Sequence, residues 1–239
     1  FEWKGPGDEW GSILSILGGR LVTLCANPPR AYGINLKRDL VLGDDSTMVA
    51  RVVHYICQYL NITQPLIWLN KPTNGALITP VYLSEGRFGI ALNREVCGQL
   101  SVEELACTLT VSLILSQPNT MLALHPNRDQ ILNELQIALS SQGWINKGEQ
   151  KKPSNPKRVQ AMQTMLKTLS PQDINELRGL CQQVGSVDRW VLALEQTAYR
   201  ASLLICSDPR LVQMLISALG VISSDQESER RYKLLLYSV

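Results

Sequence analysis

Apolar residues recur every three or four positions through most of this chain, a spacing that predicts amphipathic helices. The first predicted helix covers residues 8–24. The pair Gly18-Gly19 inside it predicts a kink or a break, because glycine weakens a helix interior. The second begins at a cap formed by Asp45 or Ser46 and ends near residue 60. Further helices are predicted over residues 121–124, 130–139, 157–169, 171–184, 187–206 and 209–221, with a last basic segment at 227–237.

The segment 101–115 differs from the others because its apolar residues cover nearly the whole circumference of the helix. Ser101 is placed to cap the first turn, and the hydroxyls inside the segment belong to Thr108, Thr110 and Ser112. A helix that is apolar on every side is buried, and hydroxyls in mid-helix can hydrogen-bond to the preceding turn. We therefore expect a buried central helix that organises the domain.

Three short apolar segments, residues 66–69, 76–83 and 87–92, are separated by turn-forming residues and predict strands. The simplest arrangement of strands joined by such short turns is an antiparallel β-meander. The predicted fold is therefore mainly α with a small antiparallel β-meander, in the α+β class.

The polar stretch 142–157, rich in Gly, Pro and Lys, is the best candidate for an exposed loop or linker. It separates residues 1–141, which hold the N-terminal helices, the meander and the central helix, from the C-terminal helices of residues 158–239. We expect both parts to pack on the same core as a single domain. Because the chain begins at Phe1 rather than Met, we also expect it to be a piece of a longer protein.

Composition narrows the classes of function. Of the 239 residues, 45% are hydrophobic and 18% charged, as in ordinary globular proteins. The net charge of +2 provides no field that calls for nucleic acid. No apolar run reaches the roughly 18 residues of a membrane span. The six cysteines are scattered without a CxxC pair, which favours reduced thiols in a reducing compartment such as the cytoplasm. Three disulfides in an exported protein are the alternative.

The residues that carry chemistry are few. A zinc site needs three or four converging ligands, but the only two histidines, His54 and His125, are far apart in sequence and fit structural roles. No serine or cysteine lies in a nucleophile elbow, and Gly18-Gly19 is not followed by a phosphate-binding lysine. The sequence thus predicts no catalytic residue, no metal and no cofactor. Glu195, at the edge of an apolar helix stripe, is expected to pair with an arginine such as Arg200.

Two segments nevertheless resemble the HExxH-containing gluzincin peptidases of the CAAX-protease and heat-shock-protease type. The run from Phe88 through the central helix is similar to the strand and zinc helix of that family, and Glu195-Gln196-Thr197-Ala198-Tyr199 is similar to its ExxAD motif. The resemblance places Val111, Ser112 and Leu115 where the family has His, Glu and His, and Tyr199 replaces the Asp. It implies a zincin-like layout around the central helix, with a degenerate site that binds no metal.

Over most of its length the chain is more similar to catalytically degenerate domains of this type at the ends of large bacterial tetratricopeptide-repeat proteins, as in myxobacteria. This similarity implies a scaffold or protein-interaction module with protein partners in a larger assembly, and without nucleic acid or a membrane span. Two alternatives stay open. One is an active metallopeptidase in which Glu195 is the surviving ligand. The other is a helical adaptor whose basic loop, residues 147–157, docks an acidic partner or lipid headgroups.

Overall fold

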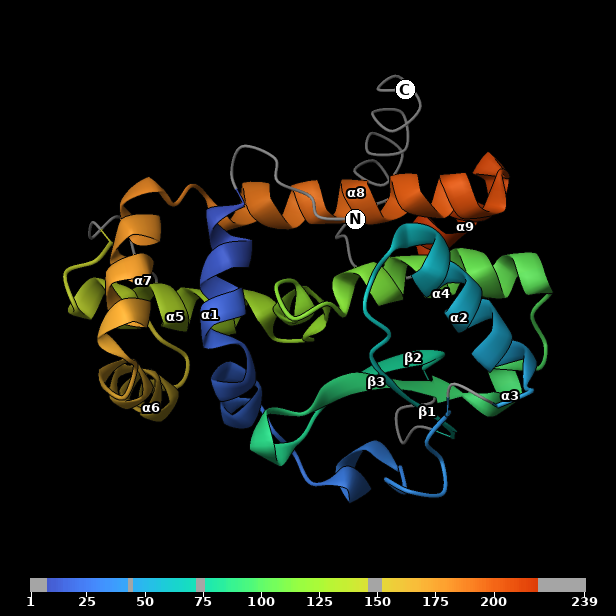
Figure 1. Ribbon diagram of the computed structural model, residues 1–239, viewed down its shortest axis with the longest axis horizontal. Helices are drawn as coiled ribbons and strands as arrows, with labels where there is room; N and C mark the ends of the chain where they lie inside the picture. Colours follow the sequence, from blue (N-terminus) through green and yellow to red (C-terminus); the bar gives the residue numbers. More distant parts are fainter. Residues whose placement is uncertain (1–7, 43–44, 72–75, 146–151, 219–239) are drawn as a thin grey trace.

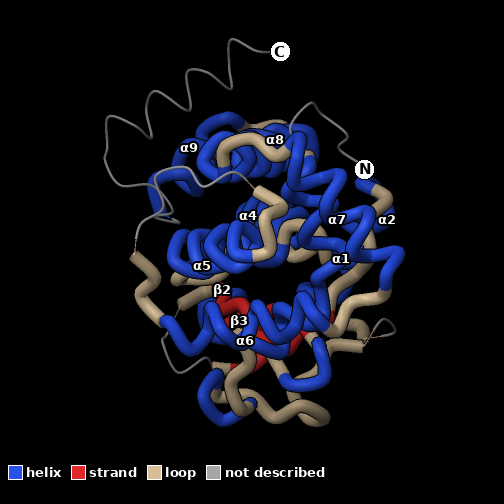
Figure 2. Tube along the Cα trace, turned by 90° about the vertical axis from the view of Figure 1, so that its left-hand side faces the viewer, coloured by secondary structure: helices blue, strands red, loops and turns tan. Residues whose placement is uncertain are grey.

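The central helix is α4 (Val102–Leu115), and its boundary follows from a capping box at its first turn. Ser101 Oγ accepts a hydrogen bond from the backbone N–H of Glu104 (3.1 Å), and the Glu104 carboxylate accepts one from the backbone N–H of Ser101 (2.8 Å). Every residue of α4 from Cys107 onward is buried. Both views place α4 between α8 and the sheet (Figures 1 and 2), which confirms the predicted buried central helix.

The structure is a computed structural model that describes residues 8–42, 45–71, 76–145 and 152–218. It is mainly helical with one small sheet, as the α+β class predicts. The remaining elements are α1 (Glu9–Leu24), η1 (Pro29–Tyr32), α2 (Met48–Leu60), β1 (Leu66–Asn70), β2 (Ile78–Tyr82), η2 (Ser84–Gly86), β3 (Phe88–Asn93), α3 (Arg94–Cys97), η3 (Met121–Leu124), α5 (Arg128–Ser141), α6 (Pro156–Lys167), α7 (Pro171–Gln183), α8 (Val187–Cys206) and α9 (Pro209–Ala218).

The sheet corrects the predicted topology. Its strand order is β1-β3-β2, with β2 antiparallel and β1 parallel to β3, so the sheet is mixed and not an antiparallel meander. The turn at η2 joins β2 to β3 as a hairpin. The connection from β1 to β2 is longer, and β1 pairs with the edge of β3 opposite to β2. A further segment pairs with β1, through an isolated bridge between Leu40 and Trp68.

Alternate residues of each strand point to opposite faces of the sheet, and both faces are covered by other parts of the chain. On one face, residues such as Ile67, Ile90 and Leu92 belong to the main core beneath α4. On the other face, Trp68 and Val81 pack with residues of the segment that contains η1. The main core contains residues from both parts of the chain, from α1 to Trp144 and from α6 to α9.

Helix α1 runs without interruption through Gly18-Gly19, so of the predicted kink or break the break is wrong. Gly19 instead allows a close approach between α1 and the turn at η2. A Cβ atom on Gly86 would lie 2.9 Å from the Cα atom of Gly19. Gly86 also has a φ of 72°, a conformation that glycine adopts at little cost. The lack of a side chain on Gly86 therefore lets this turn pack against the backbone of α1.

Other predicted boundaries need smaller corrections. The cap of α2 is Thr47, whose side chain accepts from the N–H of Ala50, and not Asp45 or Ser46. Residues 121–124 form a 3₁₀ helix rather than an α-helix. Part of the predicted loop, residues 146–151, lies outside the described residues, as do residues 219–221 and the segment 227–237. No helix in the described part of the chain is long and apolar enough to cross a membrane.

Candidate functional site

The three central-helix positions singled out by the peptidase resemblance are all buried in α4. Val111 and Leu115 are 2% and 4% exposed, and neither side chain has an atom that can bind a metal. The hydroxyl of Ser112 donates to the backbone carbonyl of Thr108 at 3.3 Å, as predicted for a hydroxyl in mid-helix. These side chains therefore serve packing in the present structure.

Glu195 lies on α8, the helix that packs against α4, and it is 2% exposed. Its Oε1 accepts a hydrogen bond from Nη1 of Arg128, at the start of α5, at 3.0 Å. The expected ion pair with an arginine thus exists, and Arg128 provides its guanidinium. Arg128 is 18% exposed and also donates to the carbonyl of Ala123. A buried carboxylate needs such a cation, because an unpaired charge away from water is costly.

The two histidines lie in different surroundings. His54 is exposed on α2. His125 is half-buried, with its ring centroid 4.8 Å from that of Tyr82 and its Nδ1 accepting from the backbone N–H of Asn127 at 3.0 Å. Burial, with a contribution from the charge of Arg158, lowers the pKa of His125 to about 4. Across the described ranges, no three His, Cys, Asp or Glu side chains lie close enough together to hold a metal ion.

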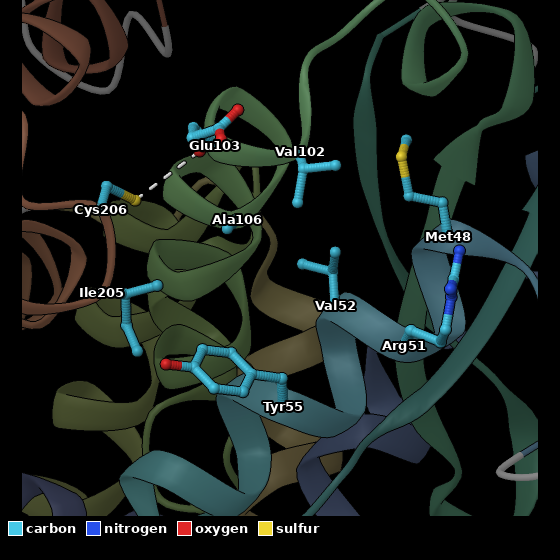
Figure 3. A pocket seen from close by; sticks show the side chains of 9 residues that line it. All are labelled: Met48, Arg51, Val52, Tyr55, Val102, Glu103, Ala106, Ile205 and Cys206. Carbon is cyan, nitrogen blue, oxygen red and sulfur yellow. Dashed lines mark hydrogen bonds between the residues drawn. The ribbon is translucent and has the colours of Figure 1, made fainter.

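A cavity lies elsewhere, between α2, the first turns of α4 and the end of α8 (Figure 3). Its volume is about 430 Å³, within the range of ligand-binding pockets. We call it the α2–α4–α8 pocket. The side chains that line it are mostly apolar: Met48, Val52, Tyr55, Val102, Ala106 and Ile205.

The apolar surface continues outside this pocket. Val102 is 51% exposed and Tyr55 is 55% exposed. One turn further along α2, Tyr59 is 59% exposed and stacks on Tyr55 with ring centroids 6.0 Å apart. Large exposed apolar side chains that adjoin a cavity are typical of an interaction site. The sequence contained part of this signal, because Tyr55 and Tyr59 lie one turn apart and outside the buried stripe of α2.

Charged and sulfur-containing side chains complete the pocket. Arg51 on α2 and Glu103 on α4 are exposed and lie on opposite sides of the apolar lining (Figure 3). Cys206, the last residue of α8, reaches the pocket and its Sγ lies 3.7 Å from the backbone carbonyl oxygen of Glu103, a contact drawn in Figure 3. The pocket thus has an apolar floor, a rim with one positive and one negative charge, and a thiol at one end.

Behind Cys206, the interface between α4 and α8 holds a second thiol. Cys107 Sγ lies 3.0 Å from Ser202 Oγ, and the Ser202 hydroxyl is also 2.9 Å from the carbonyl oxygen of Cys107. Hydrogen bonds from Cys206 and Ser202 to the Cys107 thiolate outweigh burial and lower the pKa of Cys107 to about 7. All six cysteines are free thiols, as predicted, but sequence reasoning treated them alike and missed this pair.

Comparisons with known proteins add no relative. No protein-family model matches the chain, no curated protein matches it, and no solved structure matches it. The resemblance to gluzincin peptidases and to degenerate domains of tetratricopeptide-repeat proteins therefore stays a prediction.

Proposed function

We propose that this domain is a non-catalytic protein-interaction module, part of a larger protein or assembly, that binds an apolar peptide segment of a protein partner. The binding site is the α2–α4–α8 pocket together with the adjoining tyrosines of α2. The observation that carries this proposal is the continuity between a cavity of about 430 Å³ and an exposed apolar surface beside it.

The extent of the apolar surface favours a peptide over a small molecule. A small ligand would fill the cavity but leave Tyr59, one turn beyond it, in water. A helical segment could insert one large side chain into the cavity and place a second, three or four residues away, against the stacked tyrosines. Exposed aromatic residues of this kind are enriched among the side chains that dominate binding energies.

The rim defines the chemistry of the partner further. Arg51 and Glu103 flank the apolar lining with opposite charges. A segment with an acidic residue at one end of its apolar stripe and a basic residue at the other would complement both. We expect such charges to set the orientation of the segment more than its affinity, because exposed ion pairs contribute little.

The degenerate positions support the non-catalytic part of the proposal. Val111 and Leu115 offer hydrocarbon to the core, and Glu195 is already paired with Arg128. Each side chain has a structural task that needs no metal. The free thiols fit a reducing compartment such as the cytoplasm, which we also propose.

The binding site can be tested by selecting peptides of about 16 residues from a displayed library on the full chain. Affinities of the selected peptides are then measured by fluorescence anisotropy for the parent, Tyr55→Ala and Tyr59→Ala. The two tyrosines are a matched pair, since both are exposed on α2 but only Tyr55 lines the pocket. A further variant, Ala106→Phe, fills the pocket from α4.

We expect the selected peptides to carry large apolar side chains at helical spacing. Tyr55→Ala and Ala106→Phe should weaken them by about 10- to 30-fold, the effect of losing a central contact worth 1.4–2 kcal/mol. Tyr59→Ala should weaken them by less. Equal losses for Tyr55→Ala and Tyr59→Ala, or peptides without apolar side chains, would contradict the proposal. A parent dimer that dissociates in Tyr55→Ala would assign the surface to a second copy of the chain.

The proposed peptidase ancestry has its own test. Val111→His, Ser112→Glu and Leu115→His together rebuild the HExxH pattern on α4, and Glu195 would supply the third zinc ligand if it turned away from Arg128. Zinc should then raise the melting temperature of the triple variant by mass action, and Glu195→Ala should abolish the rise. A rise that does not depend on Glu195 would show that the resemblance is coincidental.

A further inference from the structure

The thiols of Cys107 and Cys206 differ from the other cysteines of this chain in their neighbours. Cys25, Cys57, Cys97 and Cys181 are buried, and burial raises the pKa of each to about 11. Cys107 and Cys206 instead lie on adjacent turns of the α4–α8 interface. Cys206 Sγ is 3.7 Å from the carbonyl oxygen of Glu103, one turn before Cys107, and Cys107 Sγ is 3.0 Å from the hydroxyl of Ser202, one turn before Cys206.

The pair has a defined path to solvent. Cys206 is half-buried and lines the α2–α4–α8 pocket, whereas Cys107 is 1% exposed behind it. A reagent that enters the pocket therefore meets Cys206 first and can reach Cys107 only through it. This arrangement of one accessible and one shielded thiol is suited to stepwise thiol–disulfide exchange.

The surrounding groups stabilise one negative charge on the pair. The Cys107 thiolate can accept hydrogen bonds from both Cys206 and Ser202. The interaction of Cys206 with the Cys107 thiolate, followed by burial, raises the pKa of Cys206 well above the ordinary value, and the carboxylate of Glu103 adds a smaller contribution. The pKa for loss of the first proton from the pair is therefore lowered, and the pKa for loss of the second is raised. Loss of the first proton is the one that thiol–disulfide exchange requires.

We propose that Cys107 and Cys206 form a redox-active dithiol site that reacts with small disulfides of the glutathione class and closes to a disulfide between α4 and α8. This inference rests on the geometry of the thiol pair and does not depend on the peptide proposed above.

The reaction balances in two exchanges. After the pair has lost one proton to solvent, the proton of Cys206 moves to the Cys107 thiolate, and the Cys206 thiolate attacks the external disulfide to form a mixed disulfide with release of one thiolate. After Cys107 loses its proton, its thiolate attacks the sulfur of Cys206, which forms the Cys107–Cys206 bond and releases the second thiolate. The two protein protons end on the two released thiols, so the protein is oxidised by two electrons and the external disulfide is reduced to two thiols.

The test is to incubate the folded full chain with oxidised glutathione, quench with acid, unfold, and label the remaining thiols with a maleimide. Intact mass and peptide mapping then identify the products. The parent should lose two of its six reactive thiols and yield one cross-linked peptide pair that contains Cys107 and Cys206. The control Cys57→Ser should form the same cross-link.

Single variants separate the two steps. Cys107→Ser should stop after the first exchange and retain one glutathionyl group on Cys206. Cys206→Ser should stay unmodified, because Cys107 is shielded. A stable glutathionyl group on Cys206 of the parent, without the cross-link, would overturn the proposal. So would a parent in which all six thiols stay reduced, or one in which a different pair is linked.

Discussion

The ion pair between Arg128 and Glu195 provides the sharpest test of how α5 is held against α8. Arg128→Met retains most of the apolar stem and removes the guanidinium, together with its contacts to Glu195 and to the carbonyl of Ala123. Glu195 would keep a carboxylate that is 2% exposed and would lose the cation 3.0 Å from its Oε1. Glu195→Gln is the matched variant, because its amide oxygen can still accept from Arg128.

The expected magnitudes follow from burial. Removing one partner of a buried ion pair typically costs about 3–5 kcal/mol of unfolding free energy. Because Arg128 is 18% exposed and water reaches its side of the pair, we expect Arg128→Met to cost about 3 kcal/mol, at the lower end. Glu195→Gln retains a hydrogen bond and leaves a partly hydrated cation, so we expect it to cost about 1–2 kcal/mol.

The assay is urea unfolding of the parent, both single variants and the double variant, monitored by circular dichroism. The four curves are fitted with one shared dependence of the unfolding free energy on urea concentration. We expect the double variant to be more stable than the sum of the single losses predicts, by about 1.5 kcal/mol or more, because the two side chains interact. A loss below 1 kcal/mol for Arg128→Met, together with additive effects, would refute the reasoning. Glu195 would then not depend on Arg128, and a separate role for its carboxylate would regain support.

Two other predictions concern packing and pH. Gly86→Ala should destabilise the fold by about 2–4 kcal/mol, because it combines a left-handed backbone with overpacking against Gly19. Gly19→Ala, whose Cβ would lie 3.5 Å from the nearest atom, should cost less than 1 kcal/mol in the same chemical unfolding assay, and equal losses would contradict the proposed contact. The pKa of His125 is lowered to about 4, mainly by burial, so the unfolded chain takes up this proton first as the pH falls. The stabilising contribution of neutral His125 is therefore fully present above about pH 6.5 and is lost between pH 6.5 and 4. Between these two pH values, His125→Gln should reduce the loss of unfolding free energy by about 1–2 kcal/mol, after allowance for solvent screening. The same pH dependence in parent and variant would contradict this role of His125.

The sequence was most informative where a structure depends on neighbouring residues. The capping box of α4 is complete within Ser101 to Glu104, so the start of that helix could be predicted within one residue. The same holds for α8, whose predicted range of residues 187–206 is the observed one. The burial of α4 also followed from its own apolar circumference.

Features that depend on distant partners could not be predicted in this way. The close contact between Gly86 and Gly19 joins residues that are far apart in the sequence. The strand order depends on which side of β3 the first strand reaches, and alternation within a strand contains no information on that choice. The pocket is lined by residues from three separate helices. The ion pair likewise joins Glu195 on α8 to Arg128 on α5. Each of these is a tertiary property.

The two outer strands of the small sheet have a consequence for assembly. Exposed strand edges ordinarily offer free N–H and C=O groups with which another chain can pair. Here the edge of β1 is already occupied, since Val41 N–H bonds to the carbonyl of Ile67 and Leu69 N–H to the carbonyl of Asp39.

The edge of β2 is blunted by different means. The backbone groups of Leu77 and Leu83 form hydrogen bonds toward β3. Because these bonds alternate along an antiparallel strand, the even-numbered residues of β2 direct their backbone N–H and C=O groups away from β3. Among these, Pro80 has no N–H to offer, and the backbone of Tyr82 is bonded to Tyr32 and Asn27. Neither edge can readily template an added strand. Pairing of an added strand with this sheet is therefore disfavoured, and sheet-to-sheet aggregation is suppressed by the same features.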